Sequence, residues 1–170
     1  QAAYPAAKGR GTTVVVSAGN SSADAAGYSP ASCNDVITVS SVGPTGALSG
    51  FSNYGNVVDV AAPGGSGAAP AEDNILSTLN LGLQGQEGEG YAWYAGTSMS
   101  APHVSGVIAL MKWAATTPKT PDQIKKILEN TAYANGGFPT RCNYAKYCGA
   151  RILPANAAVR VAARVATAPP

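Results

Sequence analysis

Residues 96–115 read GTSMSAPHVSGVIALMKWAA, and this stretch decides the fold. From Thr97 to Lys112 the apolar residues recur at helical spacing, and the residues between them are also mostly small or apolar. A helix that is apolar nearly all round is typical of the inside of a domain rather than of its surface. Pro102 falls within its first turns, where a proline is tolerated. The sequence therefore predicts a buried central helix that starts beside Ser98.

Short β-branched runs precede this helix. They end in small and polar residues, as buried parallel strands do. The runs are TTVVVSAGN (12–20), DVITVSSV (35–42) and NVVDVAAPG (56–64), followed by two shorter strand candidates, NILSTL (74–79) and YAWYAG (91–96). The Gly- and Ala-rich stretches at 63–74 and 80–91 are predicted to be exposed loops.

Further helices are predicted on both sides of these strands. The Ala-rich residues 1–11 are consistent with the tail of a helix, and 149–168 with a last helix. In KTPDQIKKILENTA (119–132), Thr120 is the expected cap and Gln123 completes a capping box. Strands of the parallel type followed by helices indicate an α/β domain with a mostly parallel sheet.

Composition bounds the class of protein. The chain has 170 residues, enough for one domain with a core. Hydrophobic residues make up 45% and charged residues 12%, which excludes a disordered chain. The formal net charge is +2 with no cluster of Lys or Arg, so nucleic acid is not an expected partner. No membrane partner is expected either, because the longest apolar stretch, 106–115, is too short to span a bilayer.

The three cysteines indicate an oxidising compartment. Cys142 and Cys148 are six residues apart, a spacing that suits half a zinc site or a small disulfide loop. No second pair of ligands completes a zinc site, so the disulfide is the better interpretation. We expect Cys33 to pair with a cysteine upstream of Gln1.

Because the sequence begins without an initiator Met or a signal segment, we interpret it as a mature or internal piece of a longer product.

Ser98 is a candidate nucleophile. A serine hydroxyl reacts only when a general base, itself oriented by a third group, takes its proton. The free N–H groups and the dipole of a helix N-terminus favour a developing oxyanion there, and Gly96 lets a substrate backbone approach. The alternative is that Thr97 or Ser98 merely caps the helix. His103, the only histidine, lies five residues on and points away from Ser98 on a helix, so we predict a structural role for it.

Several stretches are similar to the subtilisin-like (S8) peptidases and occur in that family's order. GTSMSAPHVSG (96–106) resembles the serine motif, and VVVSAGN (14–20) resembles the strand that ends in the oxyanion-hole asparagine. Between them lie GYSPASCNDVITVSSV (27–42), SGFSNYGNVVDVAAPG (49–64) and ILSTL (75–79). The resemblance covers nearly the whole chain and implies a subtilisin-like three-layer fold.

The resemblance implies a secreted serine endopeptidase, made as a zymogen, that cuts peptide or protein substrates. On this match Ser98 is the nucleophile and Asn20 the side-chain donor to the oxyanion, whereas His103 is not the family's catalytic histidine. Asn20 also fits from the residue pattern, because it ends a parallel strand and open α/β sheets bind ligands at the carboxyl ends of their strands.

The same match assigns a substrate-binding set. Its members are small, which leaves volume for a substrate side chain, and extended backbone can pair with a peptide strand. They are Ser17, Ala18, Gly19, Gly27, Gly96 and Thr97. Ser21 brings no charge to the rim of this pocket, so we expect no strong preference for substrates with basic side chains.

No cofactor is implied for the chemistry. Structural calcium is common in the family, but the sequence assigns no metal residue. The loop carboxylates lack the regular spacing of a calcium loop and are interpreted as solvated. They are Asp24, Glu72, Asp73, Glu87 and Glu89.

Two members of the family's triad have no counterpart here. The triad runs Asp, His, Ser along the chain, and the motifs of the first two precede the oxyanion asparagine. Nineteen residues precede Asn20, and none is Asp or His. We therefore interpret 1–170 as the C-terminal half of one peptidase catalytic domain, with the N-terminal half as its partner. The alternative is a catalytically incomplete fragment or a peptide-binding remnant of such a peptidase.

Overall fold

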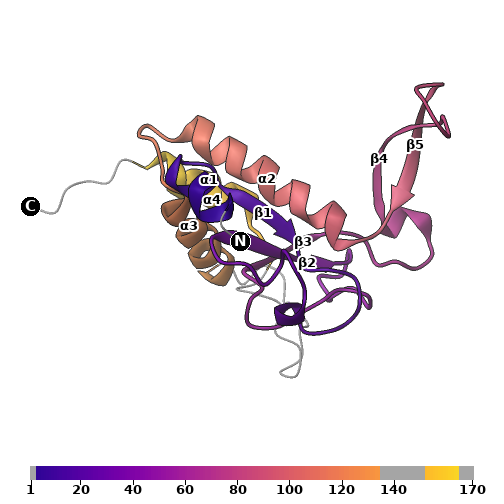
Figure 1. The fold of residues 1–170 in the computed structure, drawn as a ribbon, viewed down its shortest axis with the longest axis horizontal. Coiled ribbons are helices and arrows are strands. Elements are labelled where there is room, and N and C mark those ends of the chain that lie inside the picture. The colour runs from indigo at the N-terminus through magenta and orange to yellow at the C-terminus, as the bar shows by residue number, and fades with distance from the viewer. Residues whose placement is uncertain (1–2, 135–151, 165–170) are drawn as a thin grey trace, which may run out of the picture.

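A three-stranded parallel sheet organises the chain (Figure 1). The computed structural model describes residues 3–134 and 152–164. The strands are β1 (Val14–Ser17), β2 (Val36–Val42) and β3 (Val60–Pro63), in the order β1-β2-β3. These Val- and Ile-rich runs form strands because β-branched side chains pack well on a pleated surface. The predicted α/β class with a parallel sheet is confirmed.

The α-helices of the described part follow the predicted order. They are α1 (Ala3–Gly9), α2 (Thr97–Ala114), α3 (Pro121–Ala134) and α4 (Ala155–Ala163). Short 3-10 helices occupy Ala25–Gly27 and Ala71–Asp73. The predicted capping box at the start of α3 is present, since Thr120 N–H donates to Gln123 Oε1 (2.9 Å) and Gln123 N–H donates to Thr120 Oγ1 (3.3 Å).

Helices α2, α3 and α4 share one hydrophobic core with a single face of the sheet. Alternate residues of β2 and β3 point into this core because successive strand side chains face opposite sides. Its buried members include Ile37, Val39, Val60, Ala62, Val104, Ile108, Met111, Ile124, Leu128, Ala158 and Ala162. A second, smaller cluster is made of Ala18, Ala25, Ala31 and Val58, all of which lie in loops or a 3-10 turn. The described residues thus hold the parallel sheet with α2, α3 and α4 packed on one of its faces.

Helix α2 is buried along one side only in the described part of the chain. Val104, Val107 and Met111 face the core at helical spacing. On the opposite side Leu110 is 51% exposed and Trp113 is 84% exposed. The sequence predicted a helix buried nearly all round, and small residues do continue around it, but no described segment covers this second side.

The remaining strands form a separate antiparallel hairpin that projects away from the sheet and leads into α2 (Figure 1). Its strands are β4 (Ile75–Asn80) and β5 (Glu89–Tyr94). The Asn80 Oδ1 accepts the N–H groups of Gly82 (3.2 Å) and Glu87 (3.2 Å), which closes the turn. Much of the predicted loop 80–91 is thus an exposed hairpin tip.

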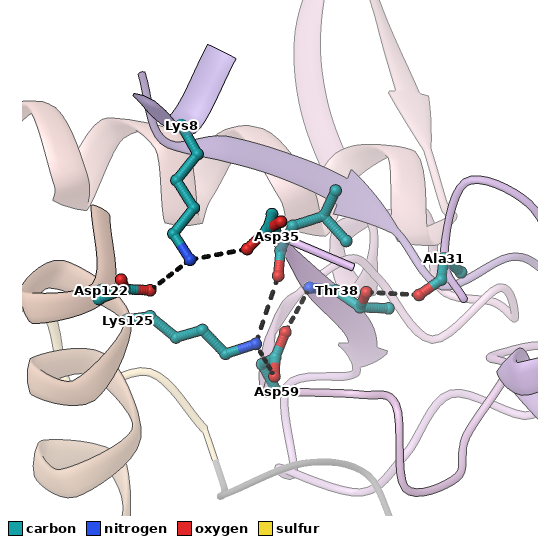
Figure 2. Close-up of polar contacts among 8 residues, drawn as sticks. Lys8, Ala31, Asp35, Thr38, Asp59, Asp122 and Lys125 are labelled. Atoms are coloured by element: carbon teal, nitrogen blue, oxygen red, sulfur yellow. Dashed lines mark hydrogen bonds and ion pairs between the residues drawn. The ribbon is translucent and has the colours of Figure 1, made fainter. Parts of the chain in front are cut away.

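Ion pairs join the sheet to α1 and α3 (Figure 2). The Lys8 Nζ lies 2.6 Å from Asp35 Oδ1 and 2.8 Å from Asp122 Oδ1. Hydrogen bonds to Asp122 and then Asp35 raise the pKa of the Lys8 ammonium. Lys125 Nζ lies 2.7 Å from Asp59 Oδ1, so α3 is tied to the residues just before β2 and β3. Partly exposed pairs of this kind contribute little stability and mainly fix orientation.

Glu129 on α3 should weaken the fold when it is ionised. Partial burial raises the pKa of its carboxyl from the usual 4.5, and the negative charge of Asp59 raises it further. The folded state therefore binds this proton more tightly than the unfolded state, so the free energy of unfolding falls as pH rises through the folded pKa. Glu129→Gln should raise Tm near neutral pH, and the gain should disappear below about pH 4.

Thermal unfolding of both proteins across a pH series measures this effect. Glu87→Gln, which neutralises an exposed carboxylate at the hairpin tip, is the matched control and should leave Tm unchanged. A gain for Glu129→Gln that persists undiminished in acid would contradict the assignment.

Candidate active site

Ser98 lies in the first turn of α2 with its side chain exposed. Thr97 is the first helical residue, and Met99 N–H donates back to Gly96 O (2.9 Å). The Ser98 N–H also belongs to this first turn, where backbone N–H groups have no intrahelical partner. An exposed hydroxyl and a free backbone donor therefore stand side by side at the positive end of the helix dipole.

The side chain of Asn20 reaches the same helix end from the loop after β1. Its Oδ1 accepts two hydrogen bonds from Thr97, one from N–H (3.0 Å) and one from Oγ1–H (2.9 Å). Because both bonds go to the carbonyl oxygen of the amide, the Nδ2 group is left to donate elsewhere. Gly19 N–H in turn donates to Thr97 Oγ1 (3.1 Å), so Thr97 joins the loop to the helix.

Gly96 keeps open a small space that the two donors share. A Cβ at this position would lie 3.3 Å from Asn20 Nδ2 and 3.7 Å from Ser98 N. A side chain there would therefore fill the space in front of both donors. Two N–H donors that converge beside a hydroxyl can stabilise an oxyanion formed when that hydroxyl attacks a carbonyl group.

The backbone of the expected pocket residues is already engaged. Ala18 N–H donates to Val39 O (2.9 Å), and Ala18 O accepts from Asn53 Nδ2 (2.9 Å). Gly19 donates to Thr97 and accepts from Asn53 N–H (2.9 Å). The N–H groups of both residues are therefore committed to internal bonds, whereas each carbonyl oxygen keeps a second lone pair, so pairing of a peptide strand with these residues stays a prediction.

The other two expected pocket residues differ in their surroundings. Ser17 ends β1 and is half-buried, next to Ala18. Gly27 ends a 3-10 turn and is exposed, and a Cβ built on it would meet no atom within 4 Å. In the described part of the chain Gly27 forms no hydrogen bond with Ser98 or Asn20, so its assignment to the pocket stays a prediction.

His103 is exposed and bonded within its own helix. Its Nδ1 lies 2.7 Å from Met99 O, the carbonyl one turn earlier. This contact agrees with the structural role predicted from helical spacing.

Asn53 is a buried polar residue near the site that sequence reasoning missed. Its side chain is 0% exposed and bonds to the backbone on both sides of Asn20. The residue lies within the quoted stretch 49–64, but nothing in that stretch indicates which distant loop its amide contacts. Burial of an asparagine is the signal to look for, because a buried amide requires partners.

Met99 should make the site sensitive to oxidation. Its Sδ would lie 3.7 Å from a Cβ on Gly96, so the thioether borders the space shared by the two N–H donors. Conversion to the polar sulfoxide disturbs both the packing and the local electric field in that space. We expect mild peroxide to inactivate the assembled protein partly and Met99→Ala to resist it. Equal losses of activity in the two proteins under matched peroxide treatment would contradict this prediction.

The remaining predictions concern metal sites, the cysteines and membrane-spanning segments. Within 3–134 and 152–164, no three His, Cys, Asp or Glu side chains lie together as a metal site, so no residue is assigned to calcium. Cys33 is half-buried and has no disulfide partner in that part of the chain. Cys142 and Cys148 lie outside the described residues. Among the described helices, none combines the length and apolarity needed to cross a bilayer.

Comparison with known proteins places the chain in a family. Residues 1–149 match the subtilase family. The chain is 44% identical over 162 residues to an extracellular protease of Xanthomonas campestris, covering 95% of this chain and 26% of that protein. It is 41% identical over 152 residues to an extracellular basic protease of Dichelobacter nodosus, covering 88% and 23%. Among solved structures, a protease of Pseudoalteromonas arctica superposes with a TM-score of 0.85 and 44% identity over 95% of this chain and 46% of that one.

The chain therefore belongs to the subtilase family, as its motifs suggested. A cold-adapted subtilisin-like serine proteinase is also similar, at 30% identity and a TM-score of 0.68. The chain spans about a quarter of the length of the two curated relatives and under half of the solved chains. The fold expected from the resemblance is confirmed.

Proposed function

We propose that this chain supplies the nucleophile and the oxyanion donors of a secreted serine endopeptidase. The observation that carries the proposal is the small space in front of Gly96, which Asn20 Nδ2 and the Ser98 N–H both border. Membership of the subtilase family and the extracellular proteases among its relatives support the reaction class and the location.

The proposed reaction follows the Ser-His-Asp scheme. Ser98 Oγ attacks the scissile carbonyl carbon while an imidazole takes the hydroxyl proton, and the oxyanion accepts bonds from Asn20 Nδ2 and Ser98 N–H. The C–N bond then breaks, and the imidazolium returns the proton to the leaving amine. Water attacks the resulting acyl ester, again through the imidazole, and restores the serine.

We propose that the imidazole and its aspartate belong to an N-terminal half that docks on this chain. Two features of the described residues support this arrangement. β1 pairs with β2 on one edge, and no described strand covers its other edge. Leu110 and Trp113 expose an apolar side of α2 beside it. Open edges and contiguous apolar faces are usually covered in a stable protein.

A peptide-binding remnant without activity is the second candidate. The open edge of β1 favours it, because an extended peptide can add to a free strand edge. The intact mass of the dissolved protein separates the two candidates, since a second polypeptide or a longer chain with Asp and His motifs supports the peptidase.

A fluorophosphonate tests whether Ser98 is the activated nucleophile. In the protein that contains the whole catalytic domain, the reagent should modify Ser98, located by peptide mass spectrometry. The Ser98→Ala variant should take up none, and the neighbouring exposed Ser105→Ala variant should label as the parent does. Labelling of any other serine in an active protein would overturn the assignment.

A further inference from the structure

Asn53 holds the loop around Asn20 from both sides. Its Oδ1 accepts the N–H groups of Ser21 (2.8 Å) and Ala23 (3.2 Å). Its Nδ2 donates to Ala18 O (2.9 Å), and its own N–H donates to Gly19 O (2.9 Å). One buried residue thus bonds to the chain on each side of the proposed oxyanion donor.

Gly19 is adapted to this contact. It has a φ of +104°, and a Cβ on it would collide with the Asn53 side-chain amide. The backbone must therefore take this left-handed conformation and lack a side chain for the amide to reach Ala18 O. Neighbouring bonds from Ser22 N–H to Phe51 O (2.8 Å) extend the same attachment.

Asn53 is not itself placed to touch a substrate. It is fully buried, and its side chain bonds to backbone groups of the loop. Asn20, by contrast, is exposed and reaches the helix end through Thr97. Any effect of Asn53 on the reaction must therefore pass through the position of Asn20.

We propose that Asn53 is a positioning residue that fixes the Asn20 amide where the oxyanion forms. This inference rests on the proposed function. An oxyanion donor acts because it is already aimed at the developing charge and needs no reorganisation during the reaction. Loss of the Asn53 amide frees both flanks of Asn20, and misplacement of a reacting group by about 1 Å can cost roughly 10²-fold in rate.

A double-mutant cycle in the active protein tests the inference. Asn53→Ala should lower kcat about tenfold or more, with KM changed less than about threefold, because the donor acts on the transition state. In an Asn20→Ala background the same substitution should lower kcat by no more than about twofold, since the donor that Asn53 positions is already absent.

Thr38→Val is the matched control for loss of a buried hydrogen bond. Thr38 is 1% exposed and its Oγ1 donates to Ala31 O (2.8 Å), a bond that involves neither Asn20 nor Asn53 (Figure 2). It should lower Tm but leave kcat unchanged in both backgrounds. If Asn53→Ala does not fold, Asn53→Asp keeps the shape and the acceptor oxygen for Ser21 and Ala23, and the same cycle is run with it.

The outcomes separate the inference from the function on which it rests. If hydrolysis by the parent does not depend on Ser98, the proposed function fails together with the inference. A second outcome is that hydrolysis by the parent depends on Ser98 while the Asn53 variant, assayed at a temperature well below its own Tm, has the same kcat as the parent. In that case the inference alone fails. Equal losses of kcat in the parent and Asn20→Ala backgrounds also overturn it, because a merely structural role is additive.

Discussion

Residues 1–170 alone should hydrolyse peptides negligibly, although they carry Ser98 and both proposed oxyanion donors. The Ser98 hydroxyl stays protonated without a general base, and the members of a triad act as a unit. The expected deficit relative to the assembled protein is roughly 10⁶-fold in kcat, a magnitude carried over from removal of the histidine of subtilisin. Turnover of a chromogenic peptide by the purified chain, before and after refolding with an Asp- and His-bearing N-terminal segment, measures it.

Two substitutions serve as controls for the assembled protein. Ser98→Ala should abolish the restored activity, whereas His103→Ala should leave kcat unchanged and affect stability alone, because its ring bonds to Met99 O within α2. If the 170-residue chain, shown by mass to be free of other polypeptides, works at protease-like rates, the exclusion of His103 is wrong.

Asn20→Ala should lower kcat by roughly 10²–10³-fold with little change in KM, the cost of losing the corresponding donor in subtilisin. The Nδ2 group meets the carbonyl oxygen most strongly when that oxygen is charged, so its loss affects the transition state more than the bound substrate. Steady-state kinetics at substrate concentrations spanning KM separate the two effects.

Asn20→Asp sharpens this test. The carboxylate keeps an oxygen to accept both bonds from Thr97 but offers no donor to the oxyanion, so its kcat should fall at least as far as that of Asn20→Ala. Asn56→Ala removes an exposed asparagine elsewhere and should leave kcat unchanged. Normal turnover by Asn20→Asp would show that Nδ2 is not the donor.

Local signals predicted the elements well. The capping box before α3 and the apolar runs of β1 to β3 depend on residues a few positions apart, so they can be predicted from the sequence. The serine and asparagine motifs located Ser98 and Asn20, and the bonds between Thr97 and Asn20, 77 positions apart, bring them together.

Contacts between residues that are distant in the sequence could not be predicted from it. The Asn53 amide reaches Ala18 across 35 positions, and no local pattern indicates that contact. The same bond occupies one of the two lone pairs of Ala18 O, which the small-residue pattern did not indicate. The one-sided burial of α2 was not predicted for a related reason. Small and apolar residues all round show that each side of a helix can be buried, but they do not identify the segment that covers each side.

The hairpin between the sheet and α2 bears on how long the proposed enzyme would survive if it is secreted. Leu83 at its tip is 97% exposed and stands among glycines, the kind of site where proteases nick folded chains. A cut there severs the covalent link between the proposed oxyanion donor Asn20 and the proposed nucleophile Ser98, while α2 stays packed on the sheet through its core residues. In a population of proteases that digest one another, working life is then governed by the rate of cleavage at this tip as much as by the equilibrium stability of the core.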